Sequence, residues 1–253
     1  MGKHGSKLIH WLNTGCTTTA ACVLWALSGL FFSNHAQARE WLGLTGAELG
    51  ENHNAYAFAG VITPLASNAA LGQGWVQRYW LDWVEYRFDS NNETVRAEAP
   101  GFSAAVGYQQ ATATGFWAGY AGAGYRKTTL SPDRPDAEVR GSQTALHLLV
   151  ELDHRFAKTW RFAGAAQLAL GPDSYWTRAK FLNKSSDAAF WQGAEIVFQG
   201  DPDYHATKVG YVLDEWSVGK GIGVNLKLGA NKTKGVKTAG YVGIEFVGSF
   251  GNR

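Results

Sequence analysis

The sequence has little cysteine and no thiol beyond residue 22. Both cysteines, Cys16 and Cys22, lie in the first tenth of the chain. A chain that loses this segment on export can form neither a disulfide nor a zinc site built on cysteine. Its stability must therefore come from burial of apolar surface or from a membrane.

An excess of charge of one sign and long apolar runs are also missing beyond residue 38. Without Lys3 and Lys7, the 23 basic residues become 21, which equals the number of acidic residues. Binding to nucleic acid needs a basic excess, so no nucleic-acid partner is expected. No apolar segment after Arg39 is long enough for a membrane helix, so a membrane crossing would have to use strands.

The first 38 residues have the three parts of a secretory signal peptide. These are two lysines, an apolar run and a small-residue cleavage site, at Lys3, Lys7, 20–32 and 36–38. We expect cleavage after Ala38. An uncleaved anchor is the alternative, which the shortness of the apolar run disfavours. Cys16 lacks the small-residue context of a lipoprotein site.

Alternation of apolar and polar residues predicts strands along the rest of the chain. In 221–229, branched aliphatic residues fill every second position, at Ile222, Val224, Leu226 and Leu228. A period of two fits a strand with one apolar face and cannot form one face of a helix. The same pattern recurs in 144–153, 160–170, 204–213 and 241–250.

Proline marks the expected ends of the strands, because it lacks the N–H that a ladder needs. The six prolines are Pro64, Pro100, Pro132, Pro135, Pro172 and Pro202. The segments between these prolines have lengths that suit a tilted membrane crossing. Eleven segments begin near Asn54, Trp75, Thr94, Phe116, Gln143, Trp160, Tyr175, Ala188, His205, Gly221 and Thr238.

Eleven is an odd number, whereas outer-membrane barrels have an even number of strands, with long loops outside and short turns inside. Splitting the third segment at Pro100 and Gly101 makes twelve and places the longest insert, 131–141, outside the cell. We therefore predict an all-β, transmembrane, up-and-down antiparallel barrel of about twelve strands over 54–253, with ten strands as the alternative. A short periplasmic segment, 39–53, would precede it, in which 40–49 is compatible with a short helix.

Composition favours this barrel over a soluble sandwich, which would also have one apolar face per strand. Glycine is frequent inside the strands, and the last strand finishes its apolar face at Phe250. Aromatic residues recur near segment ends and fit the girdles of a membrane interface: Trp75, Trp160, Tyr175, Trp176, Tyr204 and Trp216. We expect an outer-membrane location, with lipid and lipopolysaccharide around the barrel.

The opposite faces of the strands carry the polar residues that we expect in the lumen. They are Arg78, Asp82, His147, Glu151, Asp153, Arg161, Arg178, Lys180, Glu195, Lys208, Asp214, Lys227 and Glu245. Charges of both signs are balanced among them, which predicts a structural network that pairs within itself. The alternative is a polar passage that contacts hydroxyl-rich solutes.

Catalysis is not expected from the four histidines beyond residue 38. His147, Glu151 and Asp153 share one face of one strand and could form a relay or a hydrolytic site. Residues four apart in a strand lie roughly 13 Å from each other, so His147 and Glu151 do not touch. No catalytic, cofactor-binding or metal-binding residue is predicted.

Several phrases together resemble the cellulose biosynthesis protein BcsS family. They are Gly74-Trp75 with Arg78 and Trp80, Gly107-Tyr108-Gln109, Gly124-Tyr125-Arg126, Leu130-Ser131-Pro132-Asp133, Tyr175-Trp176 with Arg178, Gly193 with Glu195 and Gly200, and the strand from Tyr241 to Phe250. The resemblance implies an outer-membrane barrel without enzyme activity that assists cellulose biosynthesis or secretion. It would act as a conduit or as a docking element, with the cellulose chain and other components of the cellulose synthase complex as partners. A barrel enzyme that modifies lipid A and a generic small porin are the rival functions.

Overall fold

The computed structural model describes residues 40–251 except 52, 67–68 and 91–92. The predicted signal peptide lies outside the described residues. Twelve strands form the sheet: β1 (Trp41–Gly50), β2 (Ala55–Pro64), β3 (Gln73–Ser90), β4 (Glu93–Thr112), β5 (Gly115–Ser131), β6 (Gly141–Ala157), β7 (Trp160–Leu170), β8 (Ser174–Asn183), β9 (Trp191–Gly200), β10 (His205–Gly219), β11 (Ile222–Thr233) and β12 (Ala239–Phe250). Over the described ranges, no helix has the length and apolar character of a membrane span.

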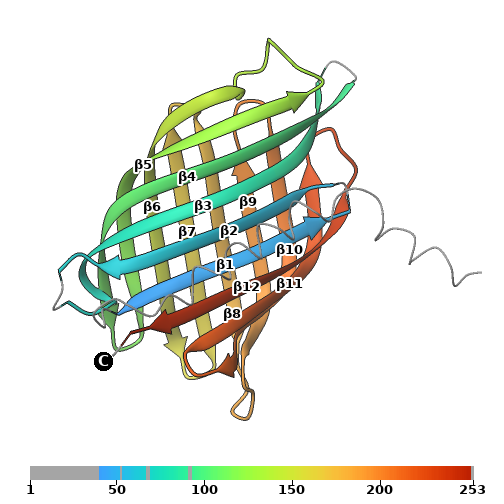
Figure 1. Ribbon diagram of the computed structural model, residues 1–253. Coiled ribbons are helices and arrows are strands. Elements are labelled where there is room, and N and C mark those ends of the chain that lie inside the picture. The colour runs from blue at the N-terminus through green and yellow to red at the C-terminus, as the bar shows by residue number, and fades with distance from the viewer. Residues whose placement is uncertain (1–39, 52, 67–68, 91–92, 252–253) are drawn as a thin grey trace, which may run out of the picture. The chain divides into compact units, whose positions relative to one another are not determined.

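Each strand pairs with its neighbours in the sequence, and β1 pairs with β12 to close the barrel (Figure 1). The closing register runs from Trp41 opposite Phe250 to Gly50 opposite Tyr241. All neighbouring strands are antiparallel, so the predicted twelve-strand, up-and-down barrel is confirmed. We call the end where β1 begins and β12 finishes the terminal end, and the opposite end the mouth.

The twelfth strand is β1, and it comes from the segment that the sequence pattern placed before the barrel. The expected short helix at 40–49 is wrong, and the barrel begins at Trp41 rather than at residue 54. This segment has small or apolar residues on both faces, so its period is weak. It forms a strand because β2 and β12 pair with its two edges, which is a tertiary effect.

The expected division at Pro100 is also wrong. β4 runs unbroken through it, with Pro100 opposite Trp83 and Gly101 opposite Asp82. The ladder to β5 has no pairs between Glu98 and Gly101 and then resumes in the same register. Proline removes a donor, but the strands on both sides hold the backbone extended.

The outer face of the barrel is apolar. Val150, Leu228 and Val242 are each about 60% exposed, and many other large apolar side chains on the same face are close to half exposed. A soluble protein rarely exposes apolar surface this extensive. The outer face therefore fits contact with lipid hydrocarbon.

Aromatic rings gather on the outside at the terminal end. They form groups that join neighbouring strands: Trp41 with Phe250, Trp75 with Tyr108 and Trp117, Trp160 with Phe156 and Phe181, and Phe190 with Trp216. This agrees with the girdle expected at Trp75, Trp160 and Trp216. Tyr204 and Trp176, expected in a girdle, instead face the interior.

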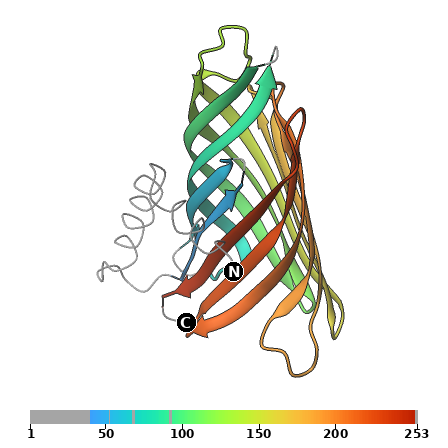
Figure 2. The same cartoon turned by 90° about the vertical axis from the view of Figure 1, so that its right-hand side faces the viewer.

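Of the apolar clusters inside the described part of the barrel, two lie at opposite ends and border the polar interior. The floor cluster, toward the terminal end, consists of Ile62, Val76, Ala118, Tyr120 and Leu149. The roof cluster, at the mouth, consists of Tyr86, Phe88, Val95, Ala97, Leu130, Tyr204 and Ala206. The strands of the β3–β4 and β5–β6 hairpins are longer than β1 and β2 and rise past them at the mouth (Figure 2). This extra length carries most of the roof cluster.

Candidate functional site

The polar residues predicted for the lumen all lie on the inner face. Eight of them line a central cavity: Arg78, Asp82, His147, Glu151, Arg178, Lys208, Lys227 and Glu245. The other five, Asp153, Arg161, Lys180, Glu195 and Asp214, form ion pairs beside it. Their part in binding a solute stays a prediction.

The larger part of the inner wall, from β6 through β12 to β1, is an ion-pair network. Arg161 pairs with Asp153, and Lys180 Nζ lies 2.8 Å from an Asp214 oxygen. Lys227 Nζ lies 2.9 Å from Glu48 and 3.0 Å from Glu245. These side chains are almost fully buried, where charges are stable only when they are paired.

Several ion pairs of this network join strands that are not neighbours. Arg178 on β8 lies 3.0 Å from Glu245 on β12, and Lys208 on β10 pairs with Glu48 on β1. Such contacts reach over the inner face instead of following a strand ladder. They occupy the lumen at the level where an open pore would need free space.

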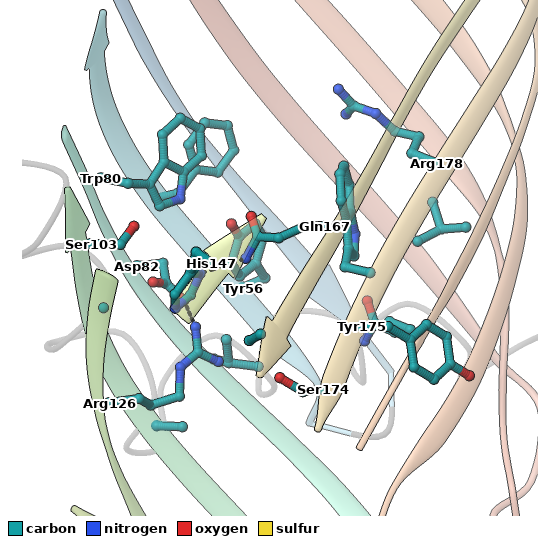
Figure 3. A pocket seen from close by; sticks show the side chains of 18 of the residues that line it. Tyr56, Trp80, Asp82, Ser103, Arg126, His147, Gln167, Ser174, Tyr175 and Arg178 are labelled. Carbon is teal, nitrogen blue, oxygen red and sulfur yellow. Dashed lines mark hydrogen bonds and ion pairs between the residues drawn. The ribbon is translucent and has the colours of Figure 1, made fainter. Parts of the chain in front are cut away.

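The cavity between these groups has a volume of about 340 Å³. Its lining combines charged groups, amides and aromatic rings. In Figure 3, Trp80 and Arg178 lie on different sides of it, with Tyr56, His147 and Gln167 between them. The floor and roof clusters contribute Ile62, Leu149, Tyr86 and Tyr204 to its lining. The cavity is therefore a polar chamber with apolar residues toward both ends.

Trp80 holds Arg78 on the wall opposite the ion-pair network. The Arg78 guanidinium lies 4.0 Å from the centroid of the Trp80 ring, and Phe58 stacks on Trp80 with 4.8 Å between centroids. The indole lies over Gly60, where a Cβ atom would stand 2.1 Å from the ring. Glycine at position 60 thus makes room for the stack.

The His147, Glu151 and Asp153 side chains do not form a joint site. A ring nitrogen of His147 lies 3.1 Å from the Gln167 amide. Glu151 accepts a hydrogen bond of 3.4 Å from the Tyr120 hydroxyl, and Asp153 pairs with Arg161. Each of the three has its own partner, as their spacing along the strand requires.

At the mouth, contacts cross the barrel. The Tyr86 and Tyr204 rings lie 4.4 Å apart, although β3 and the β9–β10 turn are far apart around the sheet. The backbone N–H of Val139, in the β5–β6 loop, donates to Asp203 in the same turn over 2.8 Å. Asp201 accepts hydrogen bonds from the backbone N–H groups of Asp203 and Tyr204. Burial at this turn raises the pKa of Asp201 to about 6.

The sequence pattern missed several residues that line the cavity. Glu48 was overlooked because its segment was not recognised as a strand, although Leu42, Leu44 and Glu48 alternate with outward residues. Arg126 pairs with Asp82. It lies on the same face of β5 as Gly122 and Gly124, so the alternation along this strand could have placed it in the lumen. In the part of the chain that the structure describes, no group of three or more acidic or histidine side chains could hold a metal ion.

A closed barrel with an apolar outer face and paired charges inside defines an integral β-barrel of the outer-membrane type. The sequence model of the family described as "Cellulose biosynthesis protein BcsS" matches residues 45–250. The chain belongs to this family, which gives it a role in cellulose biosynthesis. It matches none of the curated proteins.

Solved structures of several barrels are similar at low sequence identity. The KdgM porin has 8% identity, with 81% of this chain and 98% of that chain covered, at a TM-score of 0.42. The β domain of the Bordetella autotransporter BrkA has 11% identity, with 85% and 100% covered, at 0.45. The transport unit of AIDA-I from Escherichia coli has 10% identity, with 92% and 97% covered, at 0.44.

Proposed function

We propose that this protein is an accessory barrel of the outer membrane that supports cellulose secretion and catalyses no reaction. Membership of the family supports the process, and the apolar outer face supports the location. In barrels with an even number of strands, both termini face the periplasm. The terminal end would then meet the secretion machinery, and the mouth would face the medium.

The observation that carries this proposal is the set of ion pairs that reach across the lumen. Two of these ion pairs, Arg178 with Glu245 and Lys208 with Glu48, connect strands that are not neighbours in the barrel. The roof cluster covers the mouth above them. These contacts favour a closed barrel that docks partners over an open pore. A conduit would require both sets of contacts to separate.

The separate partners of His147, Glu151 and Asp153 support a role without catalysis. A hydrolytic barrel needs a nucleophile, a histidine and an acid in mutual hydrogen-bond reach. The His147 ring contacts an amide of Gln167 instead and faces the lumen rather than the lipid. This arrangement disfavours the rival function of lipid A modification.

Deletion of the gene in its host tests the proposal. We expect the deletion strain to produce less cellulose, and the wild-type gene should restore the output. The mass of lipid A should be the same in the deletion strain and in its parent. Planar bilayers with the refolded mature protein should show little conductance. Unchanged cellulose output would refute the accessory role, while a large steady conductance would refute the closed barrel and favour a conduit.

A further inference from the structure

Arg78 is a buried cation, and no described residue forms a hydrogen bond with its guanidinium. Its side chain is 9% exposed, and its Nε atom is buried with no acceptor. Among the described residues it forms no ion pair within 4.0 Å, and its recorded contacts are with the rings of Trp80 and Tyr120. A guanidinium has five N–H donors, and leaving them unsatisfied in a protein interior is costly. Since Arg78 lines the cavity, its donors are available to a ligand there.

Glu151 is the matching acceptor on the cavity wall. Its negative charge attracts the positive charge of Arg78 through space, but the two side chains do not form an ion pair. Its position is fixed by a chain of hydrogen bonds, in which Gln109 donates to the Tyr120 hydroxyl over 2.8 Å and Tyr120 donates to Glu151. The carboxylate retains further acceptor sites, because an ionised carboxylate can accept about four hydrogen bonds.

The other cations around the cavity are already paired. Arg126 binds Asp82, Arg178 binds Glu245, and Lys208 and Lys227 bind Glu48. Among the described charged groups that line the cavity, Asp201 is held by backbone N–H groups of the β9–β10 turn, which leaves Arg78 and Glu151 without an ion pair between the two ends. A phosphate or a uronate would meet the negative charge of Glu151, and an ammonium group would meet Arg78. A hydroxyl group can accept from one and donate to the other.

We propose that the cavity binds an uncharged, hydroxyl-rich ligand between Arg78 and Glu151, namely a short length of β-linked glucan. The glucan identity rests on the proposed function, whereas the uncharged class rests on the two side chains. The volume of about 340 Å³ lies at the small end of ligand sites, about 300–1,000 Å³, so a few sugar units fit and a long chain does not.

Calorimetric titration of the refolded mature protein in detergent tests the inference. The probes are cellotetraose and, as the acidic comparison, digalacturonate. We expect cellotetraose to bind, digalacturonate not to bind, and Arg78→Gln or Glu151→Gln each to weaken cellotetraose binding about tenfold. Arg140→Gln is the matched control, because Arg140 pairs with Asp133 in the loop outside the cavity, and it should bind as the wild type does.

Three further variants keep the test decisive. Tyr86→Ala opens the roof cluster, so it should accelerate binding if closure limits entry. If a glutamine variant does not refold, Arg78→Lys and Glu151→Asp keep the charge but change the reach, and weaker binding is again expected. The inference is overturned if neither wild type nor Tyr86→Ala binds cellotetraose, if the Arg78 and Glu151 variants bind as well as wild type, or if digalacturonate binds equally well.

Cellulose output of the deletion strain and cellotetraose binding by the wild-type protein together separate this inference from the proposed function. Suppose the wild-type gene restores cellulose output in the deletion strain but the protein binds no cellotetraose. The accessory role then stands and the glucan site is wrong. If the protein binds as expected but deletion leaves cellulose output unchanged, the site stands and the role in secretion is wrong.

Discussion

The two sides of the lumen use the same residue types in opposite ways. On the wall from β6 to β1, cations such as Arg178 and Lys227 lie within 3.0 Å of a carboxylate. On the wall around β3, Asp82 pairs with Arg126, but Arg78 stacks on Trp80 and has no carboxylate within 4.0 Å among the described residues. Buried charges in pairs hold strands together, whereas a separated donor and acceptor leave capacity for a ligand. Pairing, rather than charge, distinguishes structure from a binding site here.

The largest expected effect comes from breaking the paired side. Arg178→Met should lower the free energy of unfolding by about 3 kcal/mol, because Glu245 and Glu195 lose a buried partner. Urea titration of the refolded protein in lipid vesicles measures this. Arg140→Met, which removes an exposed pair, is the control and should change little. Equal losses in both variants would contradict the structural role of the network.

Opening the chamber above both sides should also have a large effect. Tyr86→Ala removes a ring that packs on Tyr204, at a cost of about 3 kcal/mol in unfolding free energy. With the roof cluster weakened, conductance in planar bilayers should rise. Leu81→Ala, at an outward position on the same strand, should leave conductance unchanged. A silent bilayer with folded Tyr86→Ala protein would mean that other contacts close the lumen.

The mouth should depend on pH through Asp201, which faces Asp203, Tyr86 and Tyr204. Its pKa is raised to about 6 in the folded protein, against about 3.9 unfolded. Between these values the folded state therefore binds more protons than the unfolded state. Protonation of Asp201 stabilises the fold below about pH 4, and this stabilisation is lost as pH rises through about 6. Between pH 4 and pH 7, the free energy of unfolding of wild type should fall by on the order of 2 kcal/mol more than that of Asp201→Asn, as measured by urea titration. Parallel pH profiles would contradict this.

The smallest expected effect comes from the unpaired side. Arg78→Met should change the unfolding free energy by about 1 kcal/mol or less, because the loss of stacking on Trp80 is offset by removal of an unsatisfied buried charge. The urea titration used for Arg178→Met gives the comparison. A loss as large as that of Arg178→Met would mean that Arg78 is part of the structural network, and the contrast between the two sides would disappear.

Most strands could be predicted from the sequence because one apolar face repeats every two residues, as in β11 and β6. β1 could not, since small and apolar residues lie on both of its faces with Glu48 as its one charged side chain, and its form depends on pairing with β2 and β12. Pro100 misled the prediction because a missing N–H removes ladder bonds without ending a strand that neighbours hold on both sides. Similarly, Trp176 and Tyr204 look like interface residues by type, but their parity and the folded mouth turn them inward.

The sequence by itself determined that hydrocarbon faces outward and charge inward, because alternation along a strand assigns each side chain to a face. Only the tertiary structure decided which charges meet. Arg178 and Glu245 are 67 residues apart and Lys208 and Glu48 are 160 apart, so closure of the barrel and the tilt of its strands set their distances. The same closure left Arg78 and Glu151 without an ion pair. The sequence could not show this, because its period assigns each side chain to a face and does not give distances across the lumen.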